Sequence, residues 1–239
     1  MVAGDVVGWE SRKRKLWITL VIRMPLFVGL QVLILFVSAG RIDILRVWIY
    51  LILICVYVSV STPILYRFNP ELIYQRAHGS RHGTKSWDKF LMPIIVVLPY
   101  FQLAVIGLDV GRFRWSTLGA NFAVIGVLLY VFASVLMNWA AITNRYFEPT
   151  VRIQKERGHQ VVTGGPYKII RHPGYLAGIL FPVSITFIIG SVFGLIPAGI
   201  SAVLITVRTA LEDRTLQKEL SGYSEYSKRV RYRLLLGVW

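Results

Sequence analysis

Polar residues able to do chemistry gather in two segments of an otherwise apolar chain, 145–175 and 208–239. In the first, a Thr-Gly-Gly-Pro turn at 163–166 precedes Arg171-His172-Pro173. Proline disfavours helix at the residue before it and suits the first helical position, so we expect a helix to begin at Pro173. Arg171 and His172 would then lie beside the free N–H groups of a helix start, which favour an anionic ligand group. A turn with interfacial His and Tyr residues explains the same pattern without a ligand.

The second segment contains Arg208 and Glu212, which are four residues apart and therefore lie on one face of a helix, with Asp213 directly after them. An arginine fixed by a neighbouring acid can hold a substrate carboxylate or orient a cofactor. An ordinary ion pair that stabilises a helix end is the alternative. His78 and His82 have the spacing of metal ligands, but glycines interleave them and no acid or cysteine is near, so we predict no metal site.

The composition indicates a membrane protein. Of the 239 residues, 55% are apolar and 16% are charged, whereas soluble domains carry about 25% charged residues. The net charge is +15, which nucleic-acid binding could explain, but such binding does not explain the long apolar runs. We therefore expect no nucleic-acid partner. The single cysteine, Cys55, excludes an intrachain disulfide and a cysteine-based metal site.

Six segments come close to the ~20 apolar residues that cross a bilayer. They are residues 16–37, 47–66, 91–108, 118–141, 174–190 and 192–211. Arg23 and Pro25 weaken the first span, and Pro93 and Pro99 can kink the third. The first span follows a basic run, but its apolar stretch is too long for a typical signal peptide, so we expect an uncleaved anchor.

The basic residues are divided unequally between the two sides of this map. Four of the 27, Arg41, Arg46, Arg112 and Arg114, lie on one side; Arg23 is within the first span, and all the others lie on the opposite side. Because basic residues are retained in the cytoplasm, both termini are expected there. The prediction is an all-α, multi-pass membrane protein with four spans in residues 1–143 and a functional core in residues 144–239. The last hairpin would bring the two polar segments together.

These segments resemble a known membrane family. The motif is Gly165-Pro166-Tyr167, then Arg171-His172-Pro173-Gly174-Tyr175, a hairpin, Arg208, Glu212-Asp213, Gly222-Tyr223 and Tyr226. It is similar to the isoprenylcysteine carboxyl methyltransferases and the related phospholipid N-methyltransferases. The specific features are the Arg-His-Pro-x-Tyr box and an acidic pair beyond one helical hairpin. The resemblance runs from near Asn144 to the C-terminus, and the first four spans match only in general character.

The resemblance implies a cytoplasmic S-adenosyl-L-methionine site roofed by residues 144–239, with a lipophilic acceptor that enters from the bilayer. Arg208 would orient the acceptor, and Glu212 would take the first acidic position. The usual Glu-Glu pair is Glu212-Asp213 here, and aspartate has a shorter reach. The residues that the resemblance assigns to the cofactor site are His159, Val161, Val162, Gly165, Tyr167, Arg171, His172, Tyr175 and Asp213.

The expected reaction is methyl esterification of an isoprenylcysteine-type carboxylate, which requires neither a base nor a metal. The expected partners are the membrane and a lipid or prenylated small molecule, with no obligate protein partner. A phospholipid amine, a small thiol and an isoprenoid quinone precursor remain open as acceptors. The alternatives outside this class are an NADPH-dependent membrane lipid reductase and a non-enzymatic channel, transporter or scaffold.

Overall fold

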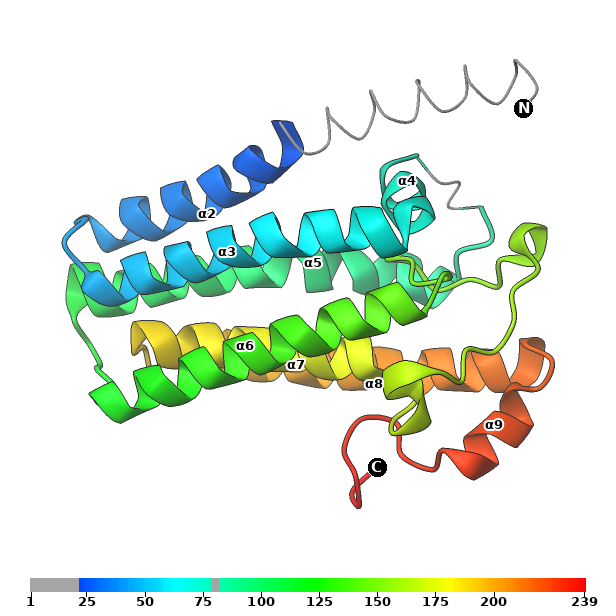
Figure 1. The fold of residues 1–239 in the computed structure, drawn as a ribbon. Helices are drawn as coiled ribbons and strands as arrows, with labels where there is room; N and C mark the ends of the chain where they lie inside the picture. The colour runs from blue at the N-terminus through cyan, green and yellow to red at the C-terminus, as the bar shows by residue number, and fades with distance from the viewer. Residues whose placement is uncertain (1–21, 79–81) are drawn as a thin grey trace, which may run out of the picture.

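The computed structural model describes residues 22–78 and 82–239, and this part of the chain consists of helices and loops without a strand (Figure 1). The predicted all-α fold is therefore confirmed. The α-helices are α2 (Met24–Ala39), α3 (Leu45–Phe68), α4 (Pro70–His78), α5 (Ser86–Gly107), α6 (Ala120–Thr143), α7 (Pro173–Ile189), α8 (Leu195–Glu219) and α9 (Tyr223–Arg229). Three short segments are the π-helix η2 (Leu108–Phe113) and the 3-10 helices η3 (Lys155–Arg157) and η4 (Gly165–Lys168).

Four helices are long and apolar enough to cross a membrane: α3, α5 together with η2, α6 and α8. The apolar helices α2 and α7 are shorter, with 16 and 17 residues, and correspond to the first and fifth expected spans. Large apolar side chains on the outer surface, such as Leu128 and Val203, are more than half exposed, as expected for lipid contact. The chain is a multi-pass integral membrane protein. Residues 16–21 of the first expected span and the basic run at 12–15 lie outside the described residues.

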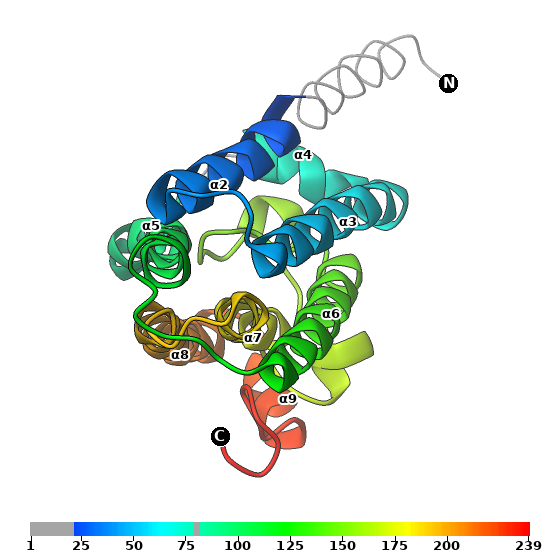
Figure 2. The same cartoon turned by 90° about the vertical axis from the view of Figure 1, so that its left-hand side faces the viewer.

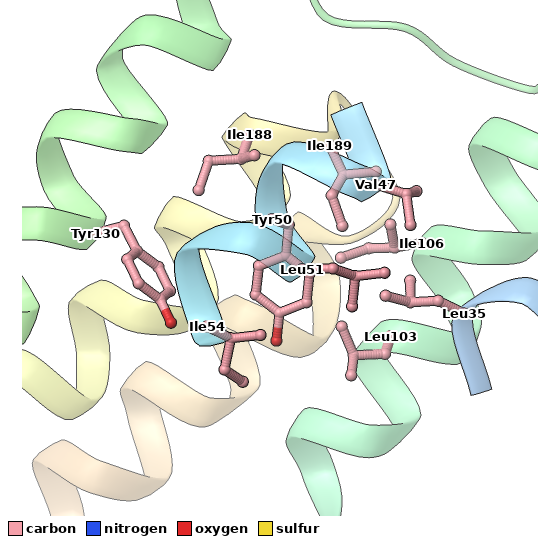
Figure 3. Packing of buried hydrophobic residues seen from close by; sticks show 10 residues of the cluster. All are labelled: Leu35, Val47, Tyr50, Leu51, Ile54, Leu103, Ile106, Tyr130, Ile188 and Ile189. Atoms are coloured by element: carbon pink, nitrogen blue, oxygen red, sulfur yellow. The ribbon is translucent and has the colours of Figure 1, made fainter. Parts of the chain in front are cut away.

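The longer helices, α2, α3 and α5 to α8, lie roughly parallel to one another (Figures 1 and 2). Viewed along the bundle in Figure 2, α7 lies between α6 and α8. α6 and α7 pack closely because Gly126 has no side chain: a Cβ there would lie 2.6 Å from the backbone nitrogen of Ile188. One apolar cluster joins α2, α3, α5, α6 and α7 (Figure 3); its buried members are Leu35, Val47, Tyr50, Leu51, Ile54, Leu103, Ile106, Tyr130, Ile188 and Ile189.

The turn of the α7–α8 hairpin is fixed by a buried carboxylate. Asp109 of η2 is fully buried, and its Oδ2 accepts hydrogen bonds from the hydroxyls of Ser116 at 2.6 Å and Ser191 at 2.5 Å. Gly190 ends α7 with a φ of +94°, a conformation that glycine adopts without strain. The predicted tight hairpin is confirmed, and its other ends, the start of α7 and the end of α8, meet far from this turn.

We call the end of the bundle formed by the starts of α5 and α7 and the ends of α6 and α8 the polar end. α8 continues eight residues beyond the Leu211 boundary expected from the sequence, to Glu219. Of the charged residues in this extension, Asp213 is buried in an ion pair with Arg171, whereas Arg214, Lys218 and Glu219 are exposed.

Candidate active site

A cavity of about 480 Å³ opens at the polar end, where the loop 144–172 covers the helices. Its polar part is lined by that loop, the start of α7 and the end of α8. Its apolar part reaches between the spans and is lined by Tyr57 of α3, Met92 and Ile95 of α5, and Met137 of α6. Cavities of about 300–1,000 Å³ that combine apolar walls with a few polar groups are typical small-molecule sites.

Arg208 lines the cavity and is held from behind by Asp88, in the first turn of α5. Its Nε donates to Oδ1 of Asp88 at 2.7 Å and its Nη2 donates to Oδ2 at 3.2 Å. The Nη2 atom also donates to the Pro149 carbonyl at 2.5 Å. Asp88 is fully buried and accepts a third hydrogen bond from the Val151 backbone N–H at 2.7 Å. The expectation that Glu212 fixes Arg208 is wrong, because the acid that pairs with this arginine is Asp88.

Glu212 has a different partner, Tyr175. The Tyr175 hydroxyl donates a hydrogen bond to Oε2 of Glu212. On the same ring, the Arg208 guanidinium carbon lies 5.2 Å from the centroid, and the His172 ring stacks at 5.7 Å with an angle of 24°. Tyr175 therefore links the acid, the arginine and the histidine into one cavity wall. His172 is the N-cap residue of α7, and the helix begins at Pro173, as predicted.

Asp213 lies behind this wall and does not line the cavity. It is fully buried, and five side chains donate to it or face it. Nη1 of Arg171 lies 2.9 Å from Oδ1 and Nε of Arg233 lies 2.9 Å from Oδ2. The remaining contacts of Asp213 are the Tyr223 hydroxyl at 2.9 Å, Nε2 of Gln217 at 2.9 Å and Nε2 of His172 at 3.3 Å.

This cluster gives Asp213 two full cationic partners, so its carboxylate is compensated although it is buried. Burial and the neighbouring Asp213 carboxylate raise the pKa of Tyr223, in α9, above its usual value. The hydroxyl of Tyr223 therefore remains a donor. The cluster joins α7, α8, α9 and the residues after α9, and it holds Arg171 and His172 against the cavity.

The loop before α7 supplies the opposite wall. His159, Val161, Val162 and Tyr167 all line the cavity, as predicted. The His159 ring lies 4.3 Å from that of Tyr146, and its Nδ1 accepts a hydrogen bond from the Gln154 backbone N–H at 3.4 Å. Burial, aided by the Arg157 charge, lowers the pKa of His159 to about 4. The imidazole is therefore neutral at physiological pH.

Gly165, unlike the other residues that the sequence placed in this loop wall, is not part of the cavity lining. Its φ is +51°, and a Cβ there would lie 2.6 Å from the Thr143 hydroxyl and 2.9 Å from the indole nitrogen of Trp139. This glycine allows η4 to pack directly against the end of α6. The eleven predicted site residues thus divide into nine that line the cavity and two, Gly165 and Asp213, that pack behind it.

Sequence reasoning missed several residues of the site. Sequence reasoning assigned no chemical role to Asp88 or Arg233, and it named Tyr223 only as part of the family motif. Glu148 and Arg152 form a buried ion pair at 2.8 Å in the cavity wall. Their spacing of four residues was the one available signal. Asp88 is 120 residues from Arg208 and gave none. Among the described residues, no group of three or more acids, histidines or cysteines could hold a metal ion.

Part of the chain matches a known protein family. Residues 124–218 match the model of the Isoprenylcysteine carboxyl methyltransferase (ICMT) family. The resemblance predicted from the sequence is confirmed. The matched segment runs from α6 to the end of α8 and contains Arg171, His172, Tyr175, Arg208 and Glu212.

Curated relatives agree over parts of their length. Protein-S-isoprenylcysteine O-methyltransferase B of Arabidopsis thaliana is 31% identical over 94 residues, which are 39% of this chain and 45% of that protein. Probable protein-S-isoprenylcysteine O-methyltransferase of Oryza sativa subsp. indica is 32% identical over 60 residues, which are 25% of this chain and 31% of that protein. The matches span less than half the length of these relatives.

The fold is similar to a solved structure, that of the eukaryotic intramembrane Ras methyltransferase ICMT. The similarity has a TM-score of 0.51 at 19% sequence identity and covers 85% of this chain and 72% of that one. The similarity in fold therefore reaches beyond residues 124–218, the segment that the family model matches.

Proposed function

We propose that this protein is an integral-membrane, S-adenosylmethionine-dependent methyltransferase that esterifies the carboxylate of an isoprenylcysteine-type acceptor. The observation that carries the proposal is the continuity of the cavity. It joins an anchored arginine at the polar end with an apolar region between the spans, lined by Met92, Ile95 and Met137. A prenylated carboxylate has the same two parts, a charged head and an apolar chain.

Arg208 is suited to hold the carboxylate of such an acceptor. Its Nε and Nη2 atoms are occupied by Asp88 and Pro149, whereas its Nη1 makes no hydrogen bond to the described residues. Because the side chain lines the cavity, this remaining pair of N–H groups is available to a ligand. A charge-assisted hydrogen bond to a carboxylate is about twice as strong as a neutral one. Asp88 fixes the position from which that bond is made.

The remaining wall residues fit S-adenosylmethionine, a cation that also carries an aromatic base and polar groups. When bound, it supplies an activated methyl group on a positively charged sulfur. Tyr175 and Tyr167 present aromatic rings, which attract cations, and Glu212 adds a carboxylate. His159 is neutral and can stack or hydrogen-bond without repelling the cation. Gly165 and Asp213 would act indirectly, by holding the loop and the Arg171–His172 pair.

The reaction transfers the methyl group to a carboxylate oxygen and leaves a methyl ester and S-adenosylhomocysteine, so no proton has to move. Arg208 would hold the carboxylate of the acceptor in a fixed position, and such alignment of reactants can supply up to about 7–11 kcal/mol in ideal cases. Phe147 and its neighbours in the loop 144–172 line the cavity, and charge interactions are stronger where such walls exclude water. Neither a base nor a metal is needed for this transfer.

We further propose that the polar end and both termini face the cytoplasm. Among the Lys and Arg residues that the structure describes, Arg41, Arg46, Arg112 and Arg114 lie at the opposite end and Arg23 directly precedes α2, whereas the others lie towards the polar end. In this orientation residues 1–143 supply four spans and the apolar approach to the site, and residues 144–239 form the methyltransferase core.

The proposal is tested by calorimetric binding of S-adenosylhomocysteine and of NADP⁺ to the purified protein. Saturable binding of the former alone supports a methyltransferase, whereas binding of NADP⁺ alone supports a lipid reductase instead. Tritiated-methyl transfer to an N-acylated S-farnesylcysteine then identifies the acceptor, with phosphatidylethanolamine and a small thiol as competitors. A carboxyl methyl ester releases methanol in base, whereas an N-methyl or S-methyl product does not. A base-stable product would refute the esterification.

A further inference from the structure

The segment after α9, residues 230–239, has a surface that the proposed reaction does not explain. We call this segment the C-terminal tail. Leu235 is 50% exposed, Leu236 is 62% exposed and Val238 is 76% exposed. Ile169, in the loop just before α7, is 48% exposed. Isolated exposed apolar residues are common, but four large ones at the polar end indicate a surface that contacts something other than water.

The depth of the tail is fixed by its pairing with the start of α7. The backbone N–H of Arg171 donates to the Tyr232 carbonyl at 3.0 Å, and the N–H of His172 donates to the Arg233 carbonyl at 2.9 Å. The next residue, Pro173, begins an apolar helix of the bundle. The tail therefore lies at the level where the chain enters the apolar region. Figure 1 shows that it turns back from α9 towards the helices, and Figure 2 shows it on the outside of the bundle.

The charges around these apolar residues indicate what covers them. Lys168, Lys228, Arg229 and Arg231 are exposed, against a single exposed acid, Glu225, in the last 19 residues. The Trp239 ring lies beside them, with the Arg233 guanidinium carbon 4.8 Å from its centroid. Basic residues and tryptophan next to exposed leucine and valine are the composition of segments that lie in the headgroup region of an anionic membrane.

We propose that the C-terminal tail is a membrane-surface anchor. Leu235, Leu236 and Val238 enter the leaflet that the polar end faces, and Arg229 and Arg231 bind anionic lipid headgroups. The anchored tail also carries Arg233, which pairs with the buried Asp213 at 2.9 Å. Lipid contact therefore holds one member of the cluster that supports Arg171 and His172. The anchor does not depend on which reaction the cavity performs.

The test is the depth of a spin label in the full-length protein reconstituted into bilayers. Cys55 is the single cysteine, so Cys55→Ser provides a background in which Leu236→Cys is labelled. Ser224→Cys, at an exposed position of α9 outside the tail, is the matched control. We expect the label at 236 to be relaxed more by oxygen than by a water-soluble nickel chelate, and the label at 224 to show the reverse. Equal nickel access at both positions would overturn the anchor.

The lipid class is tested by comparing bilayers of phosphatidylcholine alone with bilayers that also contain phosphatidylglycerol. We expect phosphatidylglycerol to lower the nickel access at position 236, and the double substitution Arg229→Gln and Arg231→Gln to abolish this difference. If phosphatidylglycerol does not change the nickel access at position 236 in the protein that keeps Arg229 and Arg231, the proposed headgroup contact is overturned. Because no turnover is measured, these outcomes are separate from any failure of the proposed methyltransferase activity.

Discussion

The substitution Asp88→Asn tests the arginine site most directly. Asp88 accepts three hydrogen bonds, from Nε and Nη2 of Arg208 and from the Val151 N–H. An asparagine of the same shape has one oxygen, which can accept two, and its amide then faces the third donor. Loss of the buried negative charge also leaves Arg208 uncompensated. Breaking one side of a buried ion pair costs about 3–5 kcal/mol, so we expect a loss of unfolding free energy of that order.

The catalytic effect of Asp88→Asn follows from the same contacts. A hydrogen bond to a charged group contributes about 1.5–3 kcal/mol, and each 1.36 kcal/mol is a tenfold change in rate. If that bond positions Arg208, kcat/KM for a prenylcysteine acceptor falls by about 10- to 150-fold. The affinity for S-adenosylhomocysteine stays unchanged, because Asp88 does not line the cavity.

The assay combines unfolding in mixed detergent micelles, calorimetry and methyl transfer for Asp88→Asn, Arg208→Ala and the double variant. If Asp88 acts through Arg208, the double variant is no less active than Arg208→Ala alone. Additive losses would show that the two residues act separately. Asp43→Asn is the control, because Asp43 also pairs with an arginine, Arg41, but its side chain is 67% exposed. An Asp88→Asn protein with unchanged stability and kcat/KM would refute the reasoning.

Three further predictions concern residues of both cavity walls and of the packing behind them. His172→Ala should weaken S-adenosylhomocysteine binding in calorimetry, and wild-type affinity would remove this residue from the site. The lowered pKa of His159, about 4, means that stability falls as the pH drops from about 6.5 towards 4, since the unfolded chain takes up the proton first. His159→Gln should flatten that part of the curve, and an unchanged slope would contradict the shift. Gly165→Ala should lower the melting temperature more than Gly158→Ala does. Both glycines have positive φ, but only a Cβ at 165 meets other atoms; equal effects would exclude the steric explanation.

The apolar runs and the positions of proline and glycine predicted the parts of this molecule that depend on local sequence. The apolar runs predicted the helices, Pro173 marked the start of α7, and the short spacing around Gly190 predicted the hairpin. The hairpin in turn explains why Arg171 and Asp213, which are 42 residues apart, form an ion pair. The family motif supplied the identity of the cavity wall, which spacing alone could not.

Long-range pairing was not accessible to the same reasoning. Arg208 has an acid one turn away, Glu212, and the local pattern favoured that pair. The structure instead pairs Arg208 with Asp88 on another span, because Glu212 accepts from Tyr175. Likewise, nothing around Asp213 indicated that its main partners would include Arg233, beyond the end of α9. Such choices depend on how whole helices pack, and a single sequence does not record that packing.

The cluster around Asp213 also sets the order in which the molecule can be completed during synthesis. Its contributors are Arg171 and His172 before α7, Asp213 and Gln217 in α8, Tyr223 in α9 and Arg233 in the tail. Chains generally fold from the N-terminus as they emerge from the ribosome. The apolar helices can therefore enter the membrane while Asp213 still lacks two of its partners. The cavity wall is finished only when the last residues arrive, so a nascent chain interrupted within α9 would be inserted in the membrane but would lack a formed site.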